Sequence, residues 1–105
     1  MKKIIDGKIY DTEKDETRLI GKHWNGYPVN DFKHCREELY CTENGNYFLY
    51  GEGGAMSRYA ESCGDMMTDG SDIIRLTQAE ALQWAEQHLS SSDIIEEFEE
   101  QLQQA

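Results

Sequence analysis

The amino-acid sequence predicts an α+β fold, with a small curled antiparallel β-sheet of about five to six short strands followed by two C-terminal helices. Three observations carry this prediction. The chain has 105 residues, which suits one domain. Short β-rich runs separated by turn signals fill residues 1–76, and helical periodicity begins only at Thr77. We therefore expect a single domain over residues 1–105, with a strand-rich core (1–76) and an acidic helical segment (77–105).

Turn signals place the expected strands in order along the chain. Asp6-Gly7 lies between two short β-rich runs and predicts a hairpin with a two-residue type I′ turn. Aromatic residues concentrate in the middle of the chain, which is therefore expected to carry the core. The further strands are expected at Thr17–Trp24, Phe32–Thr42, Tyr47–Tyr50 and Asp72–Leu76.

The helical signals are weaker in the middle of the chain than at its end. Ala55–Ser62 is expected to form a short helix closed by Gly64, and Asp65–Ser71 a polar loop. Thr77 and Glu80 form a capping-box pattern that starts a longer helix. After the break at Ser90–Ser92, a second amphipathic stretch carries the apolar residues Ile94, Ile95, Phe98 and Leu102.

The charge of the chain is strongly negative and unevenly distributed. The formal net charge is −11, from 21 acidic and 10 basic residues. Residues 77–105 contain seven acidic residues and no Lys or Arg, so they account for −7 of the total. Such a surface repels nucleic acid and anionic membranes, and it attracts basic protein surfaces. Direct nucleic-acid or membrane binding is therefore disfavoured, and a basic protein partner is favoured.

The sequence also predicts a cytoplasmic location in a bacterial host cell. The N-terminal residues lack the apolar region of a signal peptide, and no apolar run is long enough to span a membrane. The three cysteines, Cys35, Cys41 and Cys63, are a poor basis for a disulfide framework. A reducing compartment is the consistent interpretation.

The same cysteines are the first candidates for chemistry. With His23, His34 and His88 they supply zinc-ligand residue types, but no Cys-x-x-Cys pair occurs. Cysteine catalysis requires an electropositive setting, whereas this chain is acidic. We interpret the cysteines as structural residues, with Cys35 and Cys41 able to face the core from one strand. No metal or other cofactor is expected.

Two further patterns have structural interpretations that are stronger than the chemical ones. The glycine-rich run Gly51–Gly54 follows a strand, but it lacks the Lys and Ser/Thr of a P-loop. Its glycines are better explained by positive φ or close packing. The adjacent carboxylates Glu37 and Glu38 point to opposite faces of a strand, so they cannot act as a catalytic pair. The sequence therefore predicts no enzyme active site.

The C-terminal acidic helix leaves two interpretations open. It is either an ordinary solvated face or a surface that imitates the negative array of a nucleic-acid backbone. Exposed helices commonly pair Glu with Lys one turn away, and this segment contains no Lys. The candidate partner-binding acids are Asp93, Glu96, Glu97, Glu99 and Glu100, with Asp69 and Asp72 from the strand-rich part. Tyr27 and Tyr59 are candidate exposed aromatic anchors.

Several stretches of the chain resemble a set of small proteins carried by phages and mobile elements of Gram-positive bacteria. The set includes anti-CRISPR proteins, which inhibit Cas9-type effectors. The resemblance covers most of residues 1–89 and fades in the tail. It is carried by Lys3–Thr12, Asn25–Phe32, Tyr47–Gly54, Ser57–Ala60, Ile73-Ile74 and the stretch Thr77–Leu89.

The resemblance and the charge together lead to one expected function and two alternatives. The expected function is inhibition of a CRISPR effector, most simply Cas9, by binding the protein or its guide-RNA complex through an acidic surface. The first alternative is a small acidic regulatory or toxin-neutralising protein that binds a basic host protein. The second is an enzyme acting on nucleic acid, with acidic residues as metal ligands. A homodimer through the apolar residues of the tail is also possible if the monomer does not bury them.

Overall fold

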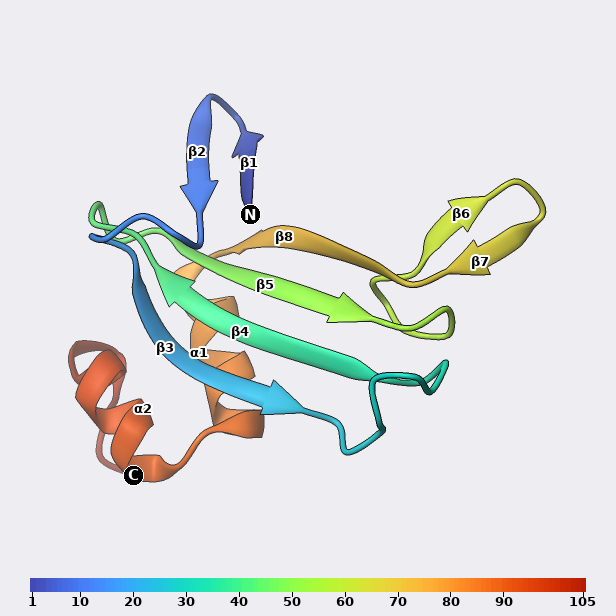
Figure 1. Ribbon diagram of the computed structural model, residues 1–105. Coiled ribbons are helices and arrows are strands. Elements are labelled where there is room, and N and C mark those ends of the chain that lie inside the picture. The colour runs from blue at the N-terminus through green and yellow to red at the C-terminus, as the bar shows by residue number, and fades with distance from the viewer.

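A computed structural model describes residues 1–105 and shows an α+β fold in which antiparallel strands precede two C-terminal helices (Figure 1). The main sheet has four antiparallel strands in the order β3-β4-β5-β8, and two separate two-stranded hairpins, β1-β2 and β6-β7, flank it. The expected fold class is thus confirmed, with eight short strands. The strands are β1 (Lys2–Ile5), β2 (Lys8–Asp11), β3 (Arg18–Trp24), β4 (Cys35–Cys41), β5 (Tyr47–Gly53), β6 (Glu61–Cys63), β7 (Met66–Thr68) and β8 (Gly70–Leu76).

The helices follow the expected start signals. Thr77 accepts a hydrogen bond from the Glu80 N–H, and the Glu80 side chain accepts one from the Thr77 N–H, so the capping box before α1 (Gln78–His88) is confirmed. Ser90 caps α2 (Ser91–Phe98), which continues into the 3₁₀ turn η1 (Glu99–Gln101). No helix is both long and apolar enough to cross a membrane.

One face of the main sheet packs against both helices and forms the larger core. Leu39 on β4 and Leu49 on β5 are fully buried there, together with Trp84 of α1 and Phe98 of α2. The ring of Phe98 stacks on that of Tyr47, with 5.4 Å between the centroids. The two helices therefore form a second layer against this face (Figure 1).

The opposite face is covered over only part of its area by the β1-β2 hairpin, which stands up from the sheet in Figure 1. Tyr10 of the hairpin packs edge-on against Phe48 and forms a smaller core with Ile73. The turn residues Asp6 and Gly7 both have positive φ (51° and 76°), as the type I′ prediction requires.

The segment between β5 and β8 departs from the sequence prediction. Residues 55–60 form turns rather than the expected helix, whose last two positions belong to β6, and the expected polar loop at 65–71 contains β7 and the start of β8. The reason lies in Gly51: a Cβ there would lie 1.8 Å from the Tyr59 ring. The contact of Tyr59 with Gly51 holds residues 55–60 against the sheet. This tertiary contact outweighs the helix propensity of the segment.

The apolar residues of the tail are mostly used within the monomer. Phe98 is buried, and Ile94 and Leu102 pack against the larger core, whereas Ile95 is exposed. Three of the four residues considered for pairing with a second copy are therefore already covered.

Replacing Phe98 with alanine is expected to lower the free energy of unfolding by about 3–5 kcal/mol, because a fully buried aromatic ring would leave a cavity between α2 and the sheet. The matched control is Ile95→Ala on the exposed side of the same helix, expected within about 0.5 kcal/mol of the native protein. Urea denaturation followed by circular dichroism measures both. Equal losses in the two variants would contradict the packing of α2.

Candidate partner-binding surface

The acidic surface is formed by the outward side of α2 and η1. Ile94 and Phe98 turn inward, whereas most of the acidic residues around them face solvent. Asp93 lies in the first turn, where the helix dipole stabilises a negative charge, and its carboxylate also accepts a hydrogen bond from Ser90 Oγ at 2.9 Å. We define the acidic surface by the exposed residues that form no salt bridge, which are Asp93, Glu96, Glu99 and Glu100.

Glu97 does not belong to this free set, and the expectation that the segment has no basic partner is wrong at this position. Arg18 at the start of β3 donates two hydrogen bonds to the Glu97 carboxylate, at 2.8 and 3.2 Å. The Tyr47 hydroxyl donates a third at 2.8 Å. The hydrogen bonds from Arg18 are the main reason that the pKa of Glu97 lies below its usual value. Glu97 therefore ties α2 to the sheet.

The other acidic candidates lie elsewhere on the molecule. Asp72 on β8 is paired with Lys3 of the hairpin at 2.7 Å, so it contributes to docking β1-β2 on the sheet. Asp69, between β7 and β8, is exposed and accepts a hydrogen bond from Thr68 Oγ1 at 3.0 Å. The structure thus brings neither of them together with the acids of α2.

Tyr59 is buried rather than exposed, with only 4% of its surface accessible. Its hydroxyl donates to the carboxylate of Glu37, which is itself 7% exposed. Trp84 Nε1 donates to the other oxygen of Glu37 at 3.1 Å, and Arg58 lies 3.3 Å away. Burial, followed by the hydrogen bond to Glu37, raises the pKa of Tyr59. Tyr59 is a core residue and is not available as a surface anchor.

Glu38 points to the opposite face of β4 from Glu37, as the alternation of side chains predicts. There it contacts Arg36 at 3.3 Å and accepts a hydrogen bond from the Tyr40 hydroxyl at 2.9 Å. Arg36 also pairs with Glu52 on β5 at 2.7 Å. The charges on this face of the sheet therefore neutralise one another and offer no strong field to a partner.

The residues considered for metal or thiol chemistry do not converge on one site, although the rings of His23 and His88 stack. No three His, Cys, Asp or Glu side chains are arranged to hold a metal ion. Cys41 is buried, Cys35 is half-buried and Cys63 is exposed. Burial raises the pKa of both Cys35 and Cys41, which keeps these thiols protonated near neutral pH.

The glycine-rich run after β5 serves close packing rather than phosphate binding. A Cβ at Gly53 would lie 2.7 Å from the His34 carbonyl oxygen, and one at Gly54 would lie 2.6 Å from the Asp31 and Phe32 carbonyl oxygens. The backbone N–H of Gly54 instead donates to the His34 carbonyl at 2.9 Å. Of the two structural explanations offered by the sequence, the structure supports close packing.

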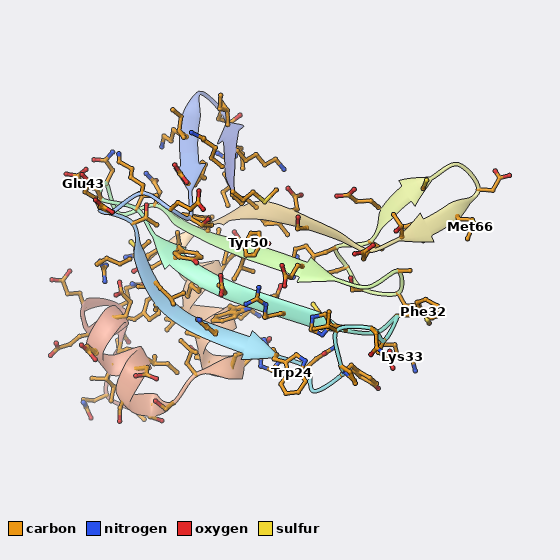
Figure 2. The ribbon with its side chains drawn as sticks, in the orientation of Figure 1. Trp24, Phe32, Lys33, Glu43, Tyr50 and Met66 are labelled. Carbon is orange, nitrogen blue, oxygen red and sulfur yellow. The ribbon has the colours of Figure 1, made fainter.

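A group of exposed apolar side chains at the end of the molecule opposite Glu43 was not identified from the sequence. Phe32 and Val29 in the β3-β4 loop are 68% and 84% exposed. Figure 2 shows Phe32 at this end, with Trp24 at the end of β3 and Met66 on the β6-β7 hairpin. The aromatic residues in the middle of the chain therefore lie partly in the core and partly on the surface. In the sequence, the Asn25-Gly26 turn signal indicates that the β3-β4 loop faces solvent. We define the aromatic–methionine surface by the exposed residues Trp24, Tyr27, Val29, Phe32, Met56 and Met67.

Two histidines meet where α1 packs on β3. The rings of His23 and His88 stack with 3.9 Å between centroids, and His88 also contacts Trp84. Burial, and then the neighbouring His23, lower the pKa of His88, while Glu37 opposes this effect. The folded protein therefore holds His88 in its neutral form more strongly than the unfolded chain does.

Replacing Glu97 with glutamine is expected to cost roughly 1–2 kcal/mol of stability, because it removes charge-assisted hydrogen bonds to a partly exposed Arg18. The adjacent Glu96→Gln is the matched control, since Glu96 is exposed and unpaired. Urea denaturation near neutral pH compares the two variants. A larger loss for Glu96→Gln would contradict the assignment of Glu97 as the structural acid.

Lowering the pH from about 7.5 to about 5.5 is expected to destabilise the protein through His88. Because its folded pKa lies below the ordinary value of 6.5, the unfolded chain binds more protons as the pH falls past that value, so unfolding becomes easier. The urea midpoint should fall over this range in the native protein and much less in His88→Gln. An equal fall in both proteins would assign the pH dependence to other groups.

Comparison of the chain with protein-family models, curated proteins and solved structures finds no match. The functional proposal therefore depends on the geometry and charge described above and on the sequence resemblance.

Proposed function

We propose that this protein is an anti-CRISPR inhibitor that binds a Cas9-type effector and occupies a basic surface otherwise used for guide RNA or target DNA. It acts by binding rather than by catalysis. The choice of effector follows from the resemblance of residues 1–89 to phage and mobile-element proteins. The observation that carries the binding mode is the acidic surface of α2 and η1, whose four carboxylates are exposed and form no salt bridge.

The density of free charge on this surface is comparable to that of a nucleic-acid strand. From Asp93 to Glu100 the helix advances roughly 10 Å, at about 1.5 Å per residue. Four free carboxylates over this length are separated by a mean of about 3.5 Å along the axis. That value is close to the roughly 3.4 Å between charges on one strand of duplex DNA and about twice the roughly 1.7 Å of both strands together. A groove lined with Lys and Arg for a phosphate backbone would therefore attract this surface.

Glu97 provides a second observation that supports binding through the acidic surface. Its ion pair with Arg18 fixes α2 on the edge of the sheet, so the four free carboxylates are presented on a rigid element. Preorganised charges lose less conformational entropy on binding than charges on a mobile tail. The acidic surface is thus better suited to specific competition than an unstructured acidic segment would be.

The test is a binding assay between the immobilised protein and a purified Cas9-type effector, with and without guide RNA. We expect binding that weakens as salt rises and that competes with guide RNA or target DNA. The triple variant Glu96→Gln/Glu99→Gln/Glu100→Gln should bind about tenfold more weakly or worse, a loss of about 1.4 kcal/mol.

The matched control removes the same charge from another part of the surface. Asp15→Asn/Glu16→Gln/Glu43→Gln changes three exposed acids in the β2-β3 and β4-β5 loops and should bind nearly as well as the native protein. Equal weakening in both triple variants would mean that net charge, not the acidic surface, drives binding. No binding to the effector in either state would overturn the proposal, and so would magnesium-dependent degradation of the guide RNA.

A further inference from the structure

The aromatic–methionine surface contains an open groove of about 300 Å³. Its apolar lining comes from Val29 and Phe32 of the β3-β4 loop and from Met67 of the β6-β7 hairpin. These are separate segments that the fold brings together around Gly54. Large exposed apolar side chains gathered in one place are uncommon on a monomer and are typical of a protein-binding surface. Aromatic residues and methionine are also the types enriched at such surfaces.

The loops that form the groove are fixed to each other by backbone hydrogen bonds. The Met56 N–H donates to the Phe32 carbonyl at 2.8 Å, and the Gly54 N–H donates to the His34 carbonyl at 2.9 Å. Trp24 Nε1 closes the base of the β3-β4 loop by donating to the Tyr27 carbonyl at 2.7 Å. The exposed side chains of the β3-β4 loop and of the segment after β5 are therefore held on a preformed scaffold, which lowers the entropic cost of binding.

The residues that line the groove include two acids, Asp31 and Asp69, and no Lys or Arg. The nearby Lys33 lies over the Tyr27 ring, 5.9 Å from its centroid. A neighbouring depression shares Val29 and Asp69 with the groove, and its further acid, Glu52, is already paired with Arg36 at 2.7 Å. From residue 59 to residue 74 the chain carries no Lys or Arg and four acidic residues, of which Asp72 is paired with Lys3, whereas Glu61, Asp65 and Asp69 form no salt bridge. A ligand that fits the groove must therefore combine apolar groups with positive charge.

We propose that the groove binds a segment of a partner protein in which apolar side chains alternate with Lys or Arg. The apolar side chains contact Val29, Phe32 and Met67, and the basic groups lie beside Asp31 and Asp69. This surface is separate from the acidic surface of α2, because the two lie at opposite ends of β3. Arg18, which pairs with α2, and Trp24 are six residues apart on that strand, a separation of about 20 Å.

The probe is a short synthetic peptide of alternating leucine and arginine, titrated into the full-length protein labelled with ¹³C at its methionine methyl groups. The chain has four methionines. We expect the signals of Met67 and Met56 to shift and that of Met1, in the β1-β2 region, to stay in place. Met66 should shift less than Met67, because neighbouring strand residues point to opposite faces of the hairpin. No shift of Met67 at the highest soluble peptide concentration would overturn the proposal.

Two further peptides separate the contributions of the apolar groups and the charge. A leucine–glutamate peptide and a serine–arginine peptide of the same length should both bind at least about tenfold more weakly. Equal binding of the first would show that the acidic residues are irrelevant. Equal binding of the second would show that the groove is not used. Either result contradicts the proposal.

Variants locate the site and exclude a second copy of the chain as its occupant. Phe32→Ser should raise the Kd for the leucine–arginine peptide about tenfold or more, whereas Ile9→Ser, an equally exposed apolar residue on the β1-β2 hairpin, should leave it unchanged. Light scattering of the native protein should give a monomer. A dimer that Phe32→Ser converts to monomer would show that the groove binds another copy and would overturn the proposal.

Discussion

The buried carboxylate of Glu37 is the constraint on which the arrangement of the molecule depends. It lies on the helix-facing side of the central strand β4, beside the apolar residues of the larger core. An unpaired charge at such a position would cost several kcal/mol. The carboxylate is instead satisfied by the Tyr59 hydroxyl, by Trp84 Nε1 and by Arg58. Since Trp84 belongs to α1 and Tyr59 to the segment after β5, one side chain fixes both on the sheet.

The same constraint explains the glycine-rich end of β5 and the position of the loops beyond it. Tyr59 can reach Glu37 only by crossing Gly51, where any side chain would collide with its ring. The segment between Gly54 and Tyr59 is thereby held against the β3-β4 loop, to which Met56 is hydrogen-bonded. The aromatic–methionine surface is therefore a consequence of how the core satisfies a buried charge.

Local signals in the sequence were sufficient to predict the fold class but not the site. The Asp6-Gly7 turn and the Thr77–Glu80 capping box are each formed by residues within a few positions of one another, so their geometry is encoded locally. The Arg18–Glu97 pair joins residues 79 positions apart, and no local pattern marks it. Counting charges along residues 77–105 therefore places Glu97, wrongly, among the acidic residues without a basic partner.

The structure of residues 54–70 is likewise not predictable from local patterns in the sequence. Ala55–Ser62 contains residues that favour a helix, but the contact of Tyr59 with Gly51 and Glu37 outweighs a propensity worth less than about 1 kcal/mol per residue. The strands of the β6-β7 hairpin are three residues long and have no buried position, so they lack the alternation of apolar and polar residues that identifies a strand.

The two surfaces belong to separate proposals, and the interactions proposed for them differ in range. The acidic surface acts through a field that salt screens over about 8 Å at physiological ionic strength. The aromatic–methionine surface, about 20 Å away along β3, acts only on contact. The first is therefore suited to accelerating encounter with a basic partner, and the second to slowing its release. Because their separation exceeds the screening length, substitutions in one surface act independently of those in the other. Glu97 is the exception, since its pairing with Arg18 joins the acidic helix to the strand that ends at Trp24.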